Sequence, residues 1–448
     1  MNAAAPLPSM RRSSLPRPSP WALAWLALWA VLGVAVGVDL SAAELWLFAG
    51  GSLLLVLVLD AVRLMRSAGP EIRRELADTW PMGVERPVRL SLQSGTRRQR
   101  LDVFDLHPGS WNVRGLPRHL QLERGELASF DYHLRANARG DFSFDGMHVR
   151  LHSPWRLWRQ LRTVGASQVV RVFPNFAPLA KFAMFSADQA SRMVGAHVKR
   201  RRGEGTDFHQ MREYRVGDSL RQIDWKASSR VRRLISREYQ DEKNQQLILL
   251  LDTGRRLMAR EEGRAHFDHV LDAALVVAYL ALRQGDAVGL LASGGATSWV
   301  PPRRGVAAID ELLRASYALQ PQPVATDFLA SATELFLRQR RRSLVMLVTN
   351  LRDEDMDDLL AAVDMLRGRH LVCVASLRES ALDSALAQPV NDLDAAIRAG
   401  SIAQYLEQRR VAHDALRSHG VMVLDVTCDQ LAGSLVEKYL SVKRDGLL

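Results

Sequence analysis

Two apolar stretches near the N-terminus constrain the fold of this chain more than any other feature of its sequence. Residues 21–38 carry no charged side chain, and a second apolar run covers residues 45–59. At 1.5 Å of rise per helical residue, about 20 residues are needed to cross the hydrocarbon core of a bilayer. The first run just meets that length, and the second meets it if its helix extends to Val62. Because six residues separate the runs, the sequence predicts a transmembrane helical hairpin over residues 21–63.

Charged residues on either side of the apolar runs predict their orientation. The loop between the runs carries only the acidic residues Asp39 and Glu44. The residues outside the runs include the basic positions Arg11, Arg12, Arg17, Arg63, Arg66, Arg73 and Arg74. Because lysine and arginine accumulate on the cytoplasmic side, both termini are expected in the cytoplasm, with two spans in the cell (inner) membrane and residues 1–20 as a cytoplasmic tail.

A cleaved signal peptide, cut near Ser41–Ala43, is the competing interpretation of the first apolar run. It is less favoured because a second apolar run follows at once and because the region before the first run is long and rich in proline. Trp21 and Trp46 fit aromatic anchors at opposite membrane interfaces.

The chain is basic, with 60 Lys and Arg against 49 Asp and Glu and a net charge of +11. These charges are spread along the whole sequence, which favours solvated faces and contact with membrane lipid over nucleic-acid binding. Two cysteines, Cys373 and Cys428, lie in apolar or mixed strand-like segments and are expected to be reduced core residues. Their spacing matches neither a disulfide framework nor a metal motif.

Residues 64–180 show the short alternating pattern of a β-rich domain. Val88, Leu90 and Leu92 alternate with polar residues, and similar runs recur between Gly, Pro and Asn positions. This pattern predicts an antiparallel, sandwich-like domain. The stretch at 153–162, rich in tryptophan and arginine, fits a docking or membrane-facing surface as well as it fits a turn with packed tryptophans.

Residues 244–448 alternate between strand-like and helix-like segments. Buried-strand patterns occur at 247–252, 286–293, 343–350, 370–376 and 421–426, and amphipathic helical patterns separate them. This order predicts a multidomain chain that ends in a doubly wound, Rossmann-type α/β domain with a mostly parallel sheet. Ligands bind such sheets at the carboxyl ends of the strands.

The connector over residues 181–243 contains an unusual motif. Its informative positions are Gly205, Asp207, Phe208, Arg212, Tyr214, Gly217, Asp218, Arg221, Asp224, Trp225, Lys226 and Arg230. The motif resembles the signature of the domain-of-unknown-function 58 (DUF58) family, in which it precedes a von Willebrand factor A-like domain. Asp207, Met211 and Ser229 are mild departures from the family pattern.

Basic and acidic residues alternate within this motif. A salt-bridge network that clamps the segment onto the neighbouring domain is the favoured interpretation, and a partner-binding surface stays open. Catalysis is less favoured because His209 is the only histidine of the motif and no convincing nucleophile accompanies it.

The resemblance to von Willebrand A domains implies a metal-ion-dependent adhesion site. Such a site binds Mg²⁺ or Mn²⁺ through oxygen ligands in loops that follow the strands. By element order, the corresponding residues are Asp252, Thr326 and Asn350.

This chain departs from the adhesion-site pattern. The two serine positions are Gly254 and Arg256, and an amide stands where the later carboxylate is usual. Arg255 or Arg256 is expected to pair with the first aspartate in place of a metal. The sequence therefore predicts a degenerate site that binds Mg²⁺ weakly or not at all, with no other cofactor. Participation of Asp353 or Asp355 is the minority alternative, and a plain strand-end role for the first aspartate fits the same facts.

The family resemblance implies a role rather than a reaction. It suggests a membrane-anchored, non-enzymatic adaptor or scaffold that works beside a MoxR-type AAA+ ATPase and other membrane proteins in assembly or maturation. The glycine-containing stretch at 294–299 lacks the lysine of a phosphate-binding loop, so no ATP hydrolysis is expected.

Two other functions remain open at this point. One is a metal-dependent hydrolase or nuclease that uses Asp218, Asp224 and Asp252, since clustered acids suit two-metal chemistry. The interleaved arginines disfavour it. The other is a purely structural membrane organiser without an ATPase partner.

Overall fold

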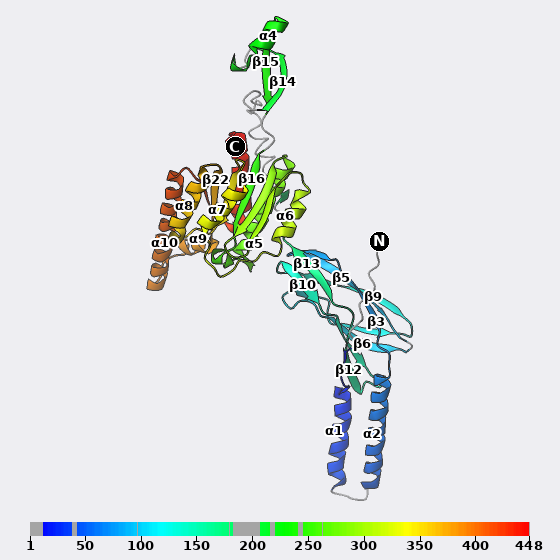
Figure 1. Cartoon of the computed structure of the whole chain (residues 1–448). Coiled ribbons are helices and arrows are strands. Elements are labelled where there is room, and N and C mark those ends of the chain that lie inside the picture. The colour runs from blue at the N-terminus through cyan, green and yellow to red at the C-terminus, as the bar shows by residue number, and fades with distance from the viewer. Residues whose placement is uncertain are drawn as a thin grey trace. The chain divides into compact units, whose positions relative to one another are not determined.

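A computed structural model describes residues 12–37, 43–95, 97–178, 180–181, 207–215, 220–240, 245–261 and 263–447. The chain divides into two compact units, Met1–Phe173 and Pro174–Leu448. The first holds two helices and a β-domain, and the second holds an α/β domain and a separate hairpin (Figure 1).

Two apolar helices, α1 (Pro20–Val36) and α2 (Ala43–Met65), begin the first unit. Ser19 caps α1 by accepting a hydrogen bond from the backbone N–H of Ala22, and Pro20 occupies the first helical turn, where a missing N–H costs nothing. Among the described residues, α2 is the one helix long and apolar enough to cross a membrane, and α1 is apolar but shorter. That both helices cross a membrane stays a prediction.

The two helices lie side by side and contact each other through tryptophans (Figure 1). The rings of Trp29 and Trp46 stack with centroids 4.4 Å apart. Each indole N–H donates to the backbone carbonyl of the other tryptophan, at 3.3 and 3.0 Å. Gly33 and Gly50 face these rings, and a Cβ at either glycine would come within 2.7 Å of one. The contact therefore depends on glycine.

The β-domain contains three sheets, whose strand orders are β1-β12-β11-β6-β8 with β2 also on β12, β3-β5-β9-β7, and β10-β13-β4. Neighbouring strands are antiparallel except for β13 and β4. The predicted alternation of buried and polar residues at 88–92 is confirmed, because Val88, Leu90 and Leu92 are fully buried. The strands are β1 (Arg12–Ser13), β2 (Arg17–Pro18), β3 (Glu71–Glu75), β4 (Thr79–Pro81), β5 (Glu85–Gln93), β6 (Gln99–Asp105), β7 (Asn112–Arg114), β8 (Arg118–Leu122), β9 (Leu127–Arg135), β10 (Gly140–Phe144), β11 (Met147–His152), β12 (Trp158–Val164) and β13 (Gln168–Phe173).

The tryptophan-rich stretch before β12 packs against the end of α2. The indole N–H of Trp158 donates to the carbonyl of Leu57 at 2.8 Å, and the backbone N–H of Trp155 donates to the carboxylate of Asp60 at 3.2 Å. The guanidinium of Arg63 lies 4.7 Å from the centre of the Trp155 ring. The last turns of α2 are therefore held by the β-domain, which favours packed tryptophans over a free docking surface.

The α/β domain is built on one sheet of order β20-β19-β16-β21-β22-β23. All neighbours are parallel except the edge strand β20. The sequence analysis did not predict β20, and its Pro301 and Pro302 are typical of loops. An edge strand tolerates proline. The sheet strands are β16 (Gln246–Asp252), β19 (Ala287–Ser293), β20 (Ser298–Arg303), β21 (Leu344–Thr349), β22 (Leu371–Arg378) and β23 (Met422–Thr427).

Helices cover both faces of this sheet (Figure 1). Leu249 and Leu251 of β16 face the core shared with α5, α6 and α11, whereas Ile248 and Leu250 face the core shared with α7, α8 and α10. The predicted doubly wound α/β architecture is thus present. The helices are α5 (His266–Arg283), α6 (Ala308–Ser316), α7 (Phe328–Arg338), α8 (Met356–Arg367), α9 (Ser380–Leu386), α10 (Leu393–Ser418) and α11 (Cys428–Arg444).

Candidate functional site

The carboxyl ends of the parallel strands bring predicted site residues to one edge of the sheet. Asp252 ends β16, Thr349 ends β21, and Asn350 follows directly. These three residues are almost fully buried. Thr326 reaches the same edge from the segment before α7.

Asp252 is held by three donors from the chain itself. Its Oδ1 accepts hydrogen bonds from the backbone N–H of Gly254, at 2.7 Å, and from the Thr326 hydroxyl. Its Oδ2 accepts from the Thr349 hydroxyl at 2.6 Å. Burial raises the pKa of Asp252 even though these hydrogen bonds oppose the shift. Both carboxylate oxygens are therefore already bonded within the protein.

The expected ion pair between Asp252 and an arginine of the next turn is not formed. Arg256 donates to Asp355 at 2.9 Å and also pairs with Glu354, and Arg255 lies 3.5 Å from Glu354. The reason is the 3₁₀ turn Arg255–Met258, which directs both arginines to the loop before α8. Asp355, considered as a substitute ligand, is the partner of Arg256 instead.

Two glycines make room for Thr326 beside Asp252. A Cβ at Gly254 would overlap the Thr326 hydroxyl and lie 2.9 Å from the carbonyl of Val324. A Cβ at Gly294 would overlap the same hydroxyl, and the φ of Gly294, +120°, already disfavours other residues. Glycine at position 254 therefore does more than remove a serine ligand. The Thr326 side chain occupies the space that a side chain at position 254 would need.

Asn350 does not join this cluster. Its Oδ1 accepts from Arg409 at 3.0 Å, and its Nδ2 donates to Glu379 at 3.0 Å. The predicted trio of site residues therefore separates into two groups. Asp252 and Thr326 bond to each other, and Thr349 is a third member of their group.

Arg409 is a candidate site residue that the sequence analysis did not identify. It is 3% exposed on α10, and it donates to Ser376 at 2.7 Å, to Asp425 at 2.8 Å, and to the carbonyl of Leu351 at 3.0 Å. It thereby joins the ends of β21, β22 and β23. The only sequence signal is helical spacing, since Ala412 and Leu416, also buried, lie three and seven residues further on.

A hollow of about 460 Å³ lies beside the Arg409 network. Arg352 pairs with Glu379 at 3.1 Å, and its guanidinium lies 4.6 Å from the centre of the Tyr405 ring. The lining residues are Arg352, Glu379, Leu382, Arg398, Ser401, Ile402 and Tyr405.

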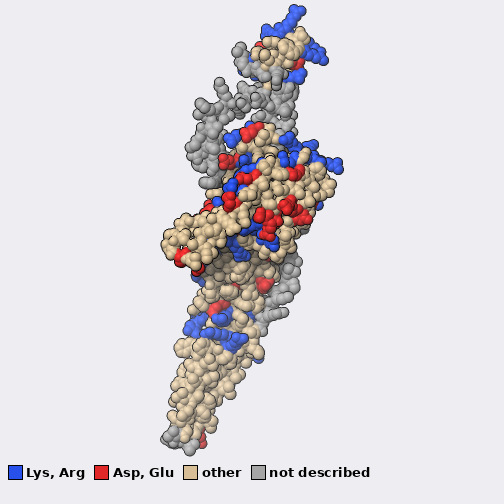
Figure 2. All heavy atoms as spheres, turned by 90° about the vertical axis from the view of Figure 1, so that its left-hand side faces the viewer, with Lys and Arg blue, Asp and Glu red and all other residues tan. Residues whose placement is uncertain are grey.

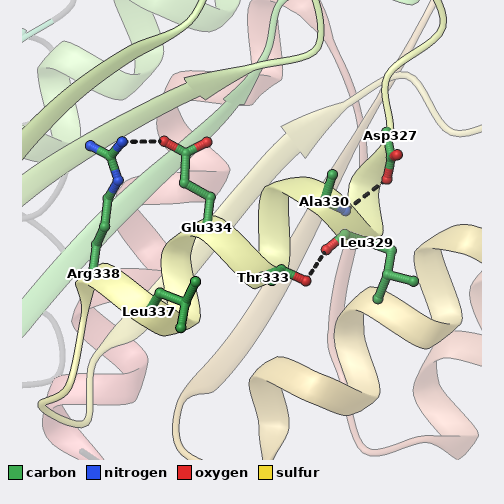
Figure 3. A pocket seen from close by; sticks show the side chains of 7 residues that line it. All are labelled: Asp327, Leu329, Ala330, Thr333, Glu334, Leu337 and Arg338. Atoms are coloured by element: carbon green, nitrogen blue, oxygen red, sulfur yellow. Dashed lines mark hydrogen bonds and ion pairs between the residues drawn. The ribbon is translucent and has the colours of Figure 1, made fainter.

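A second hollow, of about 610 Å³, runs along α7 (Figure 3). All of its lining residues belong to this helix or its cap. Several are bonded to one another: Glu334 pairs with Arg338 at 2.8 Å, and the Thr333 hydroxyl donates to the Leu329 carbonyl. Because a single helix supplies the lining, no groups converge on it from different elements.

The signature motif forms a hairpin of β14 (Asp207–Glu213) and β15 (Ile235–Gln240), with the short helix α4 (Trp225–Val231) between them. Asp224 caps α4 by accepting from the N–H of Ala227 at 2.9 Å, and it accepts from Arg237 at 2.7 Å. These two hydrogen bonds hold the pKa of Asp224 low. The 3₁₀ turn Leu220–Gln222 precedes the cap.

The ion pairs described in the motif are internal to the hairpin. Besides Asp224 with Arg237, Arg233 pairs with Glu213 at 2.7 Å. Clamping of the motif onto the neighbouring domain therefore stays a prediction. Of the predicted signature residues, Gly205, Gly217 and Asp218 lie outside the described residues, and the side chains of Asp207, Phe208 and Arg221 also lie outside what is described.

An adhesion-type metal does not fit the residues at the sheet edge. Such a metal needs oxygen ligands around the Asp252 carboxylate. Here both carboxylate oxygens accept hydrogen bonds, position 254 has no side chain, and Asn350 is bonded to Arg409 and Glu379. Nothing in the chemistry of this cluster requires a cation.

Comparisons with known proteins match part of the chain. The family model described as "Protein of unknown function DUF58" matches residues 210–400, from within β14 to within α10, which confirms the resemblance of the signature. A search of curated proteins found no match.

Three solved structures show partial similarity. Native alpha-2-macroglobulin from Escherichia coli is 15% identical with a TM-score of 0.20, over 24% of this chain and 17% of that one. An aerotolerance-related membrane protein from Bacteroides fragilis is 12% identical with a TM-score of 0.28, over 45% and 99%. A von Willebrand factor type A protein from Catenulispora acidiphila is 16% identical with a TM-score of 0.24, over 38% and 43%.

Proposed function

Because residues 210–400 carry the DUF58 domain, we propose that this protein is a membrane-anchored, non-enzymatic adaptor that presents its α/β domain and signature hairpin to a cytosolic protein partner. The proposed partner is a MoxR-type AAA+ ATPase, and the proposed process is the assembly or maturation of other proteins. The α2 helix and its apolar neighbour α1 supply the anchor in this proposal.

One observation carries the proposal: Trp225 is 68% exposed on a helix that the hairpin holds firmly in place. The buried cap Asp224 is bonded to both Ala227 and Arg237, and the buried Ser228 hydroxyl accepts from the N–H of Ile235 at 2.9 Å. Exposed tryptophans on fixed backbone are typical of the residues that dominate protein interfaces. The hairpin thus orders a helix whose largest apolar side chain faces solvent.

The charge around Trp225 favours an acidic partner surface. Lys226, Arg230 and Arg232 are exposed on or next to α4, and the basic side chains of this part of the chain are visible in Figure 2. Opposite charges across an interface speed the encounter and fix its orientation. An ATPase surface rich in aspartate and glutamate would suit this hairpin.

The hydrolase alternative finds little support in the acids proposed for it. Asp252 is bonded to two threonine hydroxyls and a backbone N–H, and Asp224 is bonded to Arg237. Asp218 lies outside the described residues. Acids that are already bonded in this way are poorly placed to hold two metal ions.

Co-purification tests the proposed partnership. The tagged, detergent-solubilised full chain is isolated from its own membranes with Mg²⁺ or with EDTA, and the bound proteins are identified by mass spectrometry. We expect a MoxR-type ATPase under both conditions. Trp225→Ala should reduce its recovery at least about 10-fold, the effect of losing a central interface tryptophan. Leu337→Ala is the matched control, because Leu337 is 71% exposed on α7, outside the hairpin.

Three results would each count against one part of this proposal: the hairpin as the interface, the metal-free sheet edge, or the ATPase as the partner. Equal recovery with Trp225→Ala would remove the hairpin from the interface. Recovery only with Mg²⁺ that also disappears in Asp252→Ala would restore a metal site at the sheet edge. Absence of any ATPase would favour the purely structural membrane organiser.

A further inference from the structure

Three side chains with metal-ligating atoms meet in the α/β domain at a place that the adaptor function does not use. His266 is the first residue of α5, Cys428 is the first residue of α11, and Glu261 ends the short strand β17 (Arg260–Glu261). Their ligand atoms all lie within 4.8 Å of one another. The three residues come from segments up to 167 positions apart, so only the tertiary fold brings them together.

Three buried polar atoms of this cluster lack hydrogen-bond partners among the described residues. His266 is 0% exposed, and among the described residues neither of its ring nitrogens has a hydrogen-bond partner. The Oε2 of Glu261 is likewise buried without a partner and lies 3.6 Å from the Nε2 of His266. Buried polar atoms are nearly always bonded in native proteins, so an orphaned histidine beside an orphaned carboxylate oxygen needs an explanation.

A bound cation satisfies these atoms better than the alternatives do. A nucleophilic Cys-His-Glu arrangement would need an accessible thiol, yet Cys428 is only 9% exposed. A thiolate, a carboxylate and a neutral imidazole would instead balance the charge of one divalent cation. Zn²⁺ is the ion whose preference for sulfur, nitrogen and oxygen ligands matches this set.

We propose that Glu261, His266 and Cys428 form a binding site for one divalent transition-metal ion of the zinc class. The site joins β17 to the N-terminal ends of α5 and α11. Three protein ligands leave a fourth position for water. Ser380 donates to the other oxygen of Glu261, which orients the carboxylate as an outer-shell partner commonly does. Binding would release the thiol proton of Cys428 to solvent.

Metal loading of the full chain tests the site directly. The detergent-solubilised protein is stripped with a chelator, incubated with Zn²⁺ or Co²⁺, desalted and analysed for metal. We expect about one ion per chain, and with Co²⁺ an absorption band from thiolate-to-metal charge transfer. Cys428→Ser should abolish the band and weaken retention at least about 10-fold, and Glu261→Gln should weaken retention as well.

Cys373→Ser is the matched control, because Cys373 is a second free, buried cysteine that lies outside the cluster. It should keep both the band and the metal. No retained metal in the wild-type chain would overturn the proposal without any variant having to fold. Equal retention by Cys428→Ser, or loss of the band in Cys373→Ser alone, would also overturn it. Zn²⁺ should raise the apparent Tm of the wild-type chain and not that of Cys428→Ser.

Discussion

At the scale of single residues, Asp252 shows how a buried carboxylate is held without a cation. Three donors contact it, and a hydrogen bond to a charged group contributes about 1.5–3 kcal/mol. The pKa of Asp252 is nevertheless raised, so the cost of burying the charge exceeds what these bonds return. The pKa of Asp252 is therefore set by two opposing effects, burial that raises it and hydrogen bonds that lower it.

This balance predicts a pH dependence. The folded chain holds the Asp252 proton more tightly than the unfolded chain, whose aspartates have a pKa near 3.9. Stability from this group is therefore complete below about pH 4 and is lost as pH rises towards the raised pKa of the folded state. Asp252→Asn should remove this loss, so its apparent Tm should change less with pH than that of the wild type. Thermal unfolding in detergent across pH 4–8 measures it.

Removal of the acceptor itself should destabilise the folded chain. Asp252→Ala leaves the N–H of Gly254 and the hydroxyl of Thr349 without their acceptor, which should cost about 1–3 kcal/mol for each buried group. The same unfolding experiment should place the variants in the order Asn above Ala. An alanine variant as stable as the wild type would mean that the hydrogen bonds contribute nothing.

At the scale of elements, the contact between α1 and α2 depends on small residues. Two tryptophans fill the interface, and two glycines leave room for their rings. Lipid tails are as apolar as leucine, so close packing and interhelical hydrogen bonds, rather than hydrophobicity, hold such helices together. The indole hydrogen bonds to backbone carbonyls supply the polar part of this contact.

A glycine pair within α2 offers a sharp test of this packing. Gly50→Leu should push the Trp29 ring aside, because a Cβ there would lie 2.7 Å from it, whereas Gly51 has nothing within 4 Å. We expect Gly50→Leu to destabilise the chain by about 1–3 kcal/mol, the usual cost of overpacking, and Gly51→Leu to have little effect. Thermal unfolding in detergent compares the two, and equal losses would show that the tryptophan contact is unimportant.

At the scale of the whole molecule, the length of the two helices bears on the anchor. The 17 residues of α1 span about 25 Å, less than the roughly 30 Å of a typical hydrocarbon core. The 23 residues of α2 are longer, but the β-domain holds this helix from Leu57 onward. Both helices thus offer a similar apolar length, and the predicted two-span anchor would require local thinning of the bilayer.

Two spans predict that both termini lie on the same side of the membrane, and the flanking arginines predict that this side is the cytoplasm. A tag at either end should be digested by protease in inside-out vesicles and protected in right-side-out vesicles. A single cysteine introduced at Ser41, in an otherwise cysteine-free chain, should react with an impermeant reagent added from the opposite side. Tags found on opposite sides would mean a single span, with α2 as the candidate and α1 as a segment that does not cross.

The sequence determined on its own whatever depends on local periodicity and composition. Apolar runs predicted α1 and α2, alternation predicted the strands around Val88, and repeated strand and helix patterns predicted the doubly wound sheet. The signature motif predicted the similarity to the DUF58 family, whose model matches residues 210–400. These features are readable because hydrophobic spacing reports which face of an element is buried, whatever lies across from it.

Only the tertiary structure decided which side chains meet. Element order could place Asp252 and Asn350 at one sheet edge, but it could not show that they have different partners. The 3₁₀ turn directs Arg256 away from Asp252 to Asp355, and Arg409 of α10 donates to Asn350. Likewise, nothing in the spacing of two cysteines indicates that Cys428 joins His266 and Glu261. The physical reason is that such contacts depend on the directions of side chains that belong to elements far apart in the chain. A local sequence pattern contains no information about those other elements.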